Sequence, residues 1–78
     1  MAEEILIDLG TRIRQARHEA GFRNAEGLAV KLGVGIRTVQ RWEAGTGEPS
    51  ISRLREIAAI TGKPLSYFLS TNGNEARA

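Results

Sequence analysis

The chain has 78 residues, of which 41% are hydrophobic and 26% charged, with a formal net charge of +2 and no cysteine. This length predicts one domain with a modest core, and the composition is typical of a soluble globular protein. Without cysteine there is no disulfide framework and no thiolate metal site, and no apolar run reaches the roughly 18 residues needed to span a bilayer. We therefore expect a cytoplasmic protein that does not act at a membrane.

The first predicted helix covers about residues 3–19. Apolar residues recur there at three- and four-residue spacing, from Ile5 to Ala20, and form one narrow stripe. Gly10 falls inside this helix, where glycine costs up to about 1 kcal/mol relative to alanine. We expect either close packing by a neighbour or a break at this position. Gly21 is suited to end the helix.

Two short helices follow and flank a tight turn at Gly33. Asn24 is a suitable N-cap for the first of them, expected at about residues 25–32, and the second covers about residues 36–44. On a helical wheel, the apolar residues of the second helix lie on one side and its polar row lies opposite. The outward face consists of Ile36, Arg37, Gln40 and Arg41. Such a helix is suited to reading a DNA groove.

Two more helices are predicted before the C-terminus. Ser50 is a suitable N-cap for a helix over about residues 51–61, and Pro64 leads into a short helix over about residues 65–69. Residues 70–78 are polar, and we expect a flexible tail after a domain that covers residues 1–69. No strand-like alternation is present, so the sequence predicts an all-α, compact five-helix bundle.

Basic residues concentrate between residues 11 and 41, and most of them are arginines. The fork-shaped guanidinium group suits phosphates and guanine edges better than the lysine ammonium does. The alternative is an ordinary solvated surface. His18 stands alone, and the glycine-containing turns lack the Lys-Ser/Thr of a phosphate loop. We therefore expect no metal, no cofactor and no enzymatic activity.

Several segments together resemble the phage repressor/Cro-type (XRE-like) helix-turn-helix DNA-binding domain. The matching segments are LGTRIRQAR at 9–17, LAVKLGV at 28–34, TVQRWEAG at 38–45, EPS at 48–50 and LREIAAITGKPLSYFL at 54–69. The resemblance covers residues 9–69 and implies the fold of the lambda-repressor-like DNA-binding domain. It further implies that the second helix lies across the DNA backbone while the third enters the major groove.

The resemblance assigns base reading to Ile36, Arg37, Gln40 and Arg41, the same face that the helical wheel places outward. Arg37 and Arg41 can each donate two hydrogen bonds to guanine O6 and N7. Gln40 could pair with adenine or a phosphate, and Ile36 could touch a thymine methyl group or pack near the backbone. For both arginines, contact with a phosphate or with solvent is the alternative.

Phosphate contacts are expected from basic and polar residues around the motif, each with a solvated surface group as its alternative. The candidates are Arg12, Arg14, Arg23, Asn24, Lys31, Thr38, Thr46, Ser50 and Arg53. Family members usually carry Ser/Thr-Gln where Asn24-Ala25 stands here, so one phosphate contact is missing, and Arg23 is a candidate to replace it. The family also implies a structural pair between Arg17 and Glu43.

One such domain reads only a few base pairs, so the resemblance implies a homodimer on half-sites about one helical turn apart. The expected interface residues are Ile60, Leu65, Tyr67 and Phe68, which alternatively close the core of the monomer. The predicted function is a sequence-specific double-stranded DNA-binding transcriptional regulator, a repressor, associated with the nucleoid. Two alternatives stay open, namely an antitoxin-type module with a protein partner and the DNA-binding fragment of a longer regulator.

Overall fold

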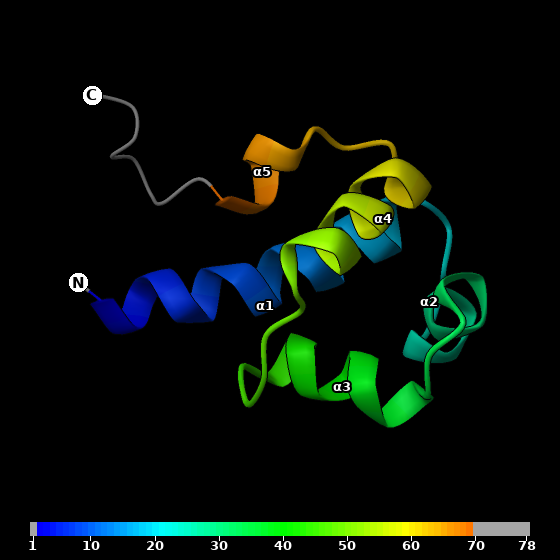
Figure 1. Ribbon diagram of the computed structural model, residues 1–78, viewed down its shortest axis with the longest axis horizontal. Coiled ribbons are helices and arrows are strands. Elements are labelled where there is room, and N and C mark those ends of the chain that lie inside the picture. The colour runs from blue at the N-terminus through cyan, green and yellow to red at the C-terminus, as the bar shows by residue number, and fades with distance from the viewer. Residues whose placement is uncertain (1, 70–78) are drawn as a thin grey trace.

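The computed structural model describes residues 2–69, with the side chains of residues 9–69, and these residues form five helices (Figure 1). They are α1 (Ala2–Glu19), α2 (Ala25–Leu32), α3 (Ile36–Ala44), α4 (Ile51–Thr61) and α5 (Leu65–Leu69). This part of the chain contains no strand, so the all-α prediction is confirmed. The tail expected at residues 70–78 lies outside the described residues. No helix in the described part has the length and apolarity that crossing a membrane requires.

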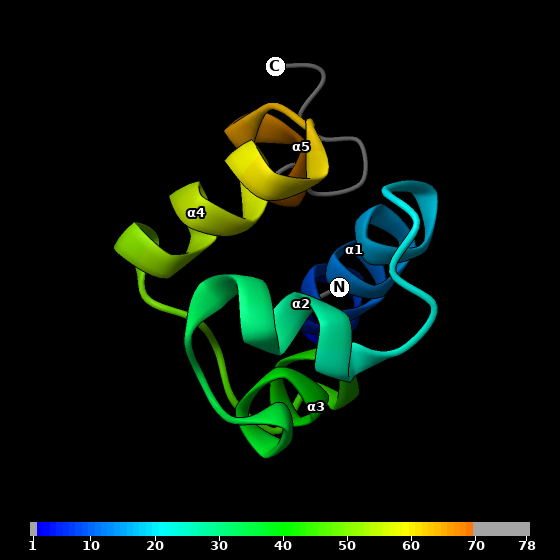
Figure 2. The same ribbon diagram turned by 90° about the vertical axis from the view of Figure 1, so that its right-hand side faces the viewer.

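The long helix α1 lies at the centre of the fold. In Figure 1 it runs across the middle, with α3 below it and α4 and α5 above it, and it packs against all three. Helix α2 packs against α3 and α4 and closes the remaining side. Figure 2 shows the same arrangement from the end, with α2 and α3 adjacent. Four large side chains are fully buried, one from each of α1 to α4: Ile13, Leu28, Val39 and Ile57.

The turn between α2 and α3 is fixed by Gly33. Its backbone φ of 75° lies in the left-handed region, where a side chain would cost conformational energy. Its N–H donates to the carbonyl groups of Ala29 and Val30, which satisfies acceptors at the end of α2. At the other end of α2, the side chain of Asn24 accepts from the Gly27 N–H at 3.3 Å. Helix α2 is thus capped at both ends at the positions expected from the sequence.

Gly10 marks the place where α1 passes over the end of α3. A Cβ atom at Gly10 would lie 2.7 Å from the carbonyl oxygens of both Trp42 and Glu43. Real Cβ atoms essentially never come so close to a backbone oxygen. Close packing by a neighbour is therefore the reason for this glycine, and α1 continues through it without a break.

The loop between α1 and α2 folds back onto α2. A Cβ atom at Gly27 would lie 2.8 Å from Cδ1 of Phe22, so the phenylalanine ring lies against the helix at this glycine. Periodicity alone gives no sign of this contact, because Phe22 stands in a loop. The contact, together with the Asn24 cap, sets how the chain enters the helix-turn-helix.

Candidate nucleic-acid interface

The outward face of α3 carries the four side chains expected to read bases. Ile36 is 42% exposed, and Arg37, Gln40 and Arg41 are exposed as well. On the opposite side of the helix, Val39 and Trp42 are buried in the core. The division between the two faces is the one that the helical wheel gives, and it leaves one row of side chains directed away from the protein.

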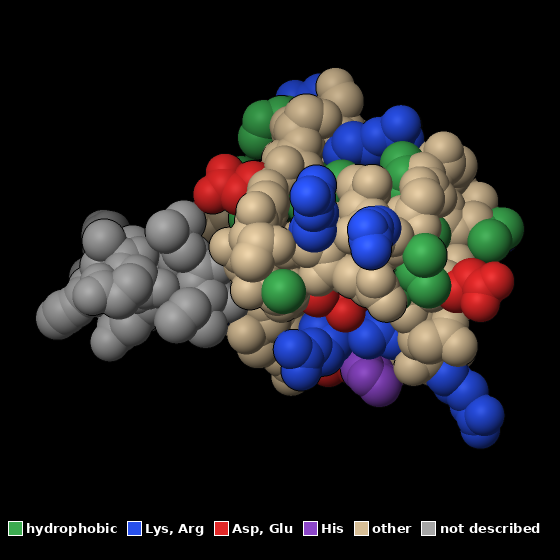
Figure 3. Space-filling view, turned by 90° about the horizontal axis from the view of Figure 1, so that it is seen from below, with side chains coloured by type: hydrophobic (Ala, Val, Ile, Leu, Met, Phe, Trp, Pro, Cys, Tyr) green, Lys and Arg blue, Asp and Glu red, His purple; other side chains and the backbone are tan. Residues whose placement is uncertain are grey.

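The side of the molecule on which α3 lies is rich in basic groups. Figure 3 looks at the molecule from this side and shows lysine and arginine side chains standing over the middle of the face and along its margins. The two basic residues of α3, Arg37 and Arg41, are exposed there. A convex helix with positive charge fits a groove lined by phosphates.

The starts of α2 and α4 offer backbone N–H groups of the kind that bind anions. Asn24 caps α2, and the hydroxyl group of Ser50 caps α4 by accepting from the Arg53 N–H at 3.1 Å. Arg23 and Thr46 are exposed in the loops that precede these two helices. The remaining phosphate candidates lie in helices: Arg14 and Lys31 are exposed, and Thr38 is half-buried.

Arg53, expected at a phosphate, is bound to the protein itself. Its Nη1 donates to the backbone carbonyl of Leu32 at 3.0 Å and to Oε1 of Glu56 at 2.8 Å. The Leu32 carbonyl belongs to the last turn of α2, where carbonyl groups lack a partner within the helix. The guanidinium group therefore fastens α4 to the end of α2, next to the turn that leads into α3.

Arg17 is the most buried charged residue among those described. Its guanidinium group binds Glu43 twice, with Nε at 2.7 Å from Oε2 and Nη2 at 3.1 Å from Oε1, and its Nη1 donates to the Phe22 carbonyl at 3.0 Å. The side chains of Arg17 and Glu43 are only 7% and 10% exposed. The pair implied by the family resemblance thus joins α1 to α3 through a bidentate contact, and the third hydrogen bond of Arg17 holds the loop before α2.

Arg12, like Arg17, connects α1 to another part of the fold, here to α5. Its Nη1 donates to the Tyr67 carbonyl at 3.0 Å, and its guanidinium group lies 5.1 Å from the centre of the Tyr67 ring. Lys63 lies 5.0 Å from the same ring and forms an ion pair with Glu19. The Lys63 ammonium group also forms a hydrogen bond with the Glu19 carboxylate, and this hydrogen bond raises the pKa of Lys63. These contacts hold α5 against α1, so Arg12 serves the fold at α5.

The predicted dimer interface requires one correction. Phe68 is only 3% exposed and belongs to the core of the monomer, which was the alternative for this residue. A side chain enclosed by its own chain has no surface left for a second copy. Ile60, Leu65 and Tyr67 are half-buried and keep an exposed part.

Within the described residues, no group of three potential metal ligands comes together.

The fold and the exposed arginine-bearing helix define a small helix-turn-helix domain. A family model described as "Helix-turn-helix" matches residues 13–68, and the chain belongs to this family. The resemblance to the phage repressor/Cro type is thereby confirmed. No solved structure gives a significant match.

The curated relatives that match the chain include two bacterial proteins with transcriptional regulator in their names. An "Uncharacterized transcriptional regulator in ATPase CF(0) region" of Rhodospirillum rubrum is 39% identical over 62 residues, which cover 80% of this chain and 56% of the relative. An "Uncharacterized HTH-type transcriptional regulator" of Sinorhizobium medicae is 37% identical over 62 residues, which cover 80% of this chain and 44% of the relative. The chain thus spans about half the length of the curated relatives that it matches.

Proposed function

We propose that the chain is a sequence-specific, double-stranded DNA-binding transcriptional regulator whose helix α3 enters the major groove. The observation that carries the proposal is the outward face of α3. Its four side chains are exposed while the opposite side of the helix is buried, and two of the four are arginines. Membership of the helix-turn-helix family and the printed names of its relatives support this function.

The spacing of the two arginines indicates what α3 could read. Arg37 and Arg41 are four residues apart, which is about 6 Å along a helix axis. Base pairs are stacked about 3.4 Å apart, so the two guanidinium groups can reach guanines roughly two base pairs from each other. Gln40 lies between them and suits an adenine or a phosphate, and Ile36 at the start of the helix suits a thymine methyl group.

Phosphate contacts would then set the position of α3 in the groove. The residues that we propose for them are Arg23, Asn24, Lys31, Thr38, Thr46 and Ser50, together with the amide groups at the starts of α2 and α4. The internal hydrogen bonds of Arg53 favour a fastening role for this side chain over a phosphate contact. If these contacts form, log affinity falls by about 0.9 per neutralised phosphate for each unit of log salt concentration.

We further propose that the protein acts as a homodimeric repressor at the nucleoid in the cytoplasm, without an enzymatic step. The exposed parts of Ile60, Leu65 and Tyr67 are the candidates for the dimer surface. Among the side chains of residues 9–69, the large exposed apolar ones stand on four different helices: Val30, Ile36, Ile51 and Leu69. Isolated exposed apolar residues are normal on a soluble domain. This distribution favours a DNA partner over an antitoxin-type protein partner.

Selection of binding sites from random duplex DNA tests the function directly. We expect a two-fold motif with guanines in each half-site and half-sites about one helical turn apart. A single asymmetric motif would keep the DNA-reading function and remove the dimer. Failure to enrich any sequence at moderate salt would contradict sequence-specific binding.

A further inference from the structure

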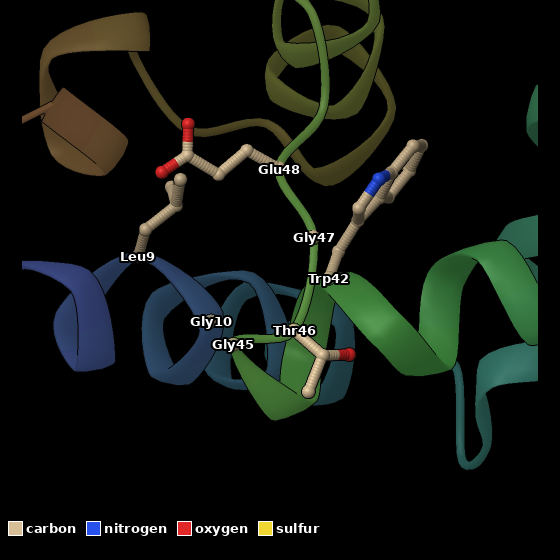
Figure 4. Close-up of a pocket in the computed structure, with 7 residues that line it drawn as sticks. All are labelled: Leu9, Gly10, Trp42, Gly45, Thr46, Gly47 and Glu48. Atoms are coloured by element: carbon tan, nitrogen blue, oxygen red, sulfur yellow. The ribbon is translucent and has the colours of Figure 1, made fainter.

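We infer that the chain binds a small organic cation in a pocket between α1 and the loop that joins α3 to α4. The pocket has a volume of about 220 Å³. Among the described side chains, it is lined by Leu9 and Gly10 of α1, Trp42 of α3 and residues 45–48 of the loop (Figure 4). The pocket reaches the buried side of α3 at Trp42, and its loop wall adjoins the outward face, because a Cβ atom at Gly47 would lie 3.8 Å from Cβ of Arg41.

Three of the residues that line the pocket have no side chain, namely Gly10, Gly45 and Gly47. Gly10 has none because α1 passes over the carbonyl groups of α3. Gly47 is different, because its backbone is not left-handed and a Cβ atom there would meet only ordinary contacts, 3.8 Å from Cβ of Arg41 and 4.0 Å from Cδ1 of Trp42. Neither backbone conformation nor close packing demands glycine at position 47. Its absent side chain leaves open space next to the indole ring.

The charge of the lining favours a cation. Glu48 is the one charged residue that lines the pocket within the described part of the chain. The ion pairs among the described residues use Glu19, Glu43 and Glu56, so Glu48 has no basic partner there. The pocket also lies at the C-terminal end of α3, which carries the partial negative charge of the helix dipole.

The apolar part of the lining can hold the organic part of the same ligand. Figure 4 shows the carboxylate of Glu48 extending towards Leu9, and the indole of Trp42 standing beside the loop at Gly47. An ammonium group can donate to Glu48 while the rest of the ligand lies against Leu9 and the small exposed edge of Trp42, whose side chain is otherwise buried. The volume is below the range of about 300–1,000 Å³ that is typical of pockets for drug-sized ligands. The ligand class is therefore a small aryl- or alkylammonium ion.

The fluorescence of Trp42 can report binding, because this is the only tryptophan of the chain. The 78-residue chain is titrated with benzylammonium chloride and, separately, with benzyl alcohol, which has the same ring without the charge. Ionic strength is held constant. We expect a saturable change with the ammonium ion and binding of the alcohol that is about threefold weaker, since the charge-assisted hydrogen bond to the exposed Glu48 carboxylate is lost. This comparison needs no variant.

Two variants locate the site. Glu48→Gln keeps the shape of the exposed side chain and removes its charge, and we expect about threefold weaker binding of benzylammonium, because a contact with an exposed carboxylate is screened by solvent. The matched control is Glu26→Gln, which changes an exposed carboxylate on α2 and should leave binding unchanged. The inference is overturned if the ammonium ion gives no saturable signal, if the alcohol binds equally well, or if Glu48→Gln binds as the unchanged chain does.

Discussion

Five arginines in the described part of the chain fall into two groups with opposite surroundings. Arg17, Arg12 and Arg53 donate to carboxylate or carbonyl oxygens of the protein, and each joins α1 or α4 to another part of the fold. Arg37 and Arg41 are exposed on α3 and have no acceptor among the described residues. The same side chain therefore serves the fold in one place and remains available for an outside partner in the other. Its surroundings, and not its type, decide between these roles.

The two groups of arginines should therefore respond differently to substitution. Loss of an internal partner leaves a desolvated charge without compensation, and this lowers the free energy of unfolding. Loss of an exposed arginine removes only its interaction with a partner outside the protein. Stability and DNA binding should therefore respond to different substitutions.

The largest effect on stability is expected from Glu43→Gln. This change removes the carboxylate from the buried pair and leaves the Arg17 guanidinium group uncompensated, at a cost of about 3–5 kcal/mol. Domains of this kind have total stabilities of about 5–15 kcal/mol, so the loss should be plain in urea unfolding followed by circular dichroism. Glu48→Gln is the control, because Glu48 is exposed. An unchanged urea midpoint for Glu43→Gln would reject the structural role of the pair.

Gly10→Ala tests whether α1 must pass so closely over α3. The added methyl group would lie against two carbonyl oxygens, and we expect a loss of about 1–3 kcal/mol of stability from overpacking. Alanine is the better helix former by about 1 kcal/mol, so propensity alone predicts the opposite sign. Gln15→Ala, at an exposed position of α1, serves as the control. A thermal unfolding midpoint that rises in Gly10→Ala would contradict the close packing.

Arg37→Ala tests the outward group. We expect a loss of about 1–3 kcal/mol of binding free energy on the selected duplex, confined to one base position, since a bidentate contact with guanine disappears. The melting temperature should stay unchanged. Lys31→Ala is the comparison, because loss of a phosphate contact weakens binding to all sequences alike. Equal weakening of every duplex by Arg37→Ala would show that Arg37 does not read a base.

Arg53→Met tests whether Arg53 holds α4 to the end of α2 or binds a DNA phosphate. Because the side chain is 38% exposed, we expect a loss of only about 1 kcal/mol of stability when its hydrogen bonds to Leu32 and Glu56 disappear. Binding to DNA should weaken while the slope of log affinity against log salt remains that of the unchanged chain. A slope reduced by about 0.9 would instead assign Arg53 to a phosphate.

The smallest effect is expected from the ion pair between Lys63 and Glu19. The hydrogen bond with Glu19 raises the pKa of Lys63 in the folded chain above its ordinary value of 10.5. The pair therefore contributes its stability below pH 10.5 and loses it as the pH rises through the raised pKa. The stability difference between the unchanged chain and Lys63→Met should be constant from neutral pH to about pH 10 and shrink above it. A difference that grows at alkaline pH would have the wrong sign.

The sequence predicts the helices of this fold well because each has a local signal. Apolar spacing defines the buried stripes, and residues such as Asn24, Gly33 and Ser50 define where helices begin and end. The outward face of α3 follows from the helical period alone. Even the close approach at Gly10 has a sequence sign, because a glycine inside a helix requires a reason.

The partners of the internal arginines could not be predicted in the same way. Arg53 and Arg12 donate to backbone carbonyl groups 21 and 55 residues away, and a carbonyl group carries no sequence signal because every residue has one. A helical wheel gives the side on which a residue lies but not what lies opposite. For the same reason, the sequence left open whether Phe68 faces the core or a second copy.

The central claim is that α3 reads guanines in the major groove through its exposed arginines. Protection of guanine N7 from dimethyl sulfate, measured on the selected duplex, tests this most directly because N7 lies in the major groove. We predict protected guanines in each half-site, with one position losing its protection in Arg37→Ala and another in Arg41→Ala. Guanines that stay reactive in the complex, or protection that both variants retain in full, would contradict the claim.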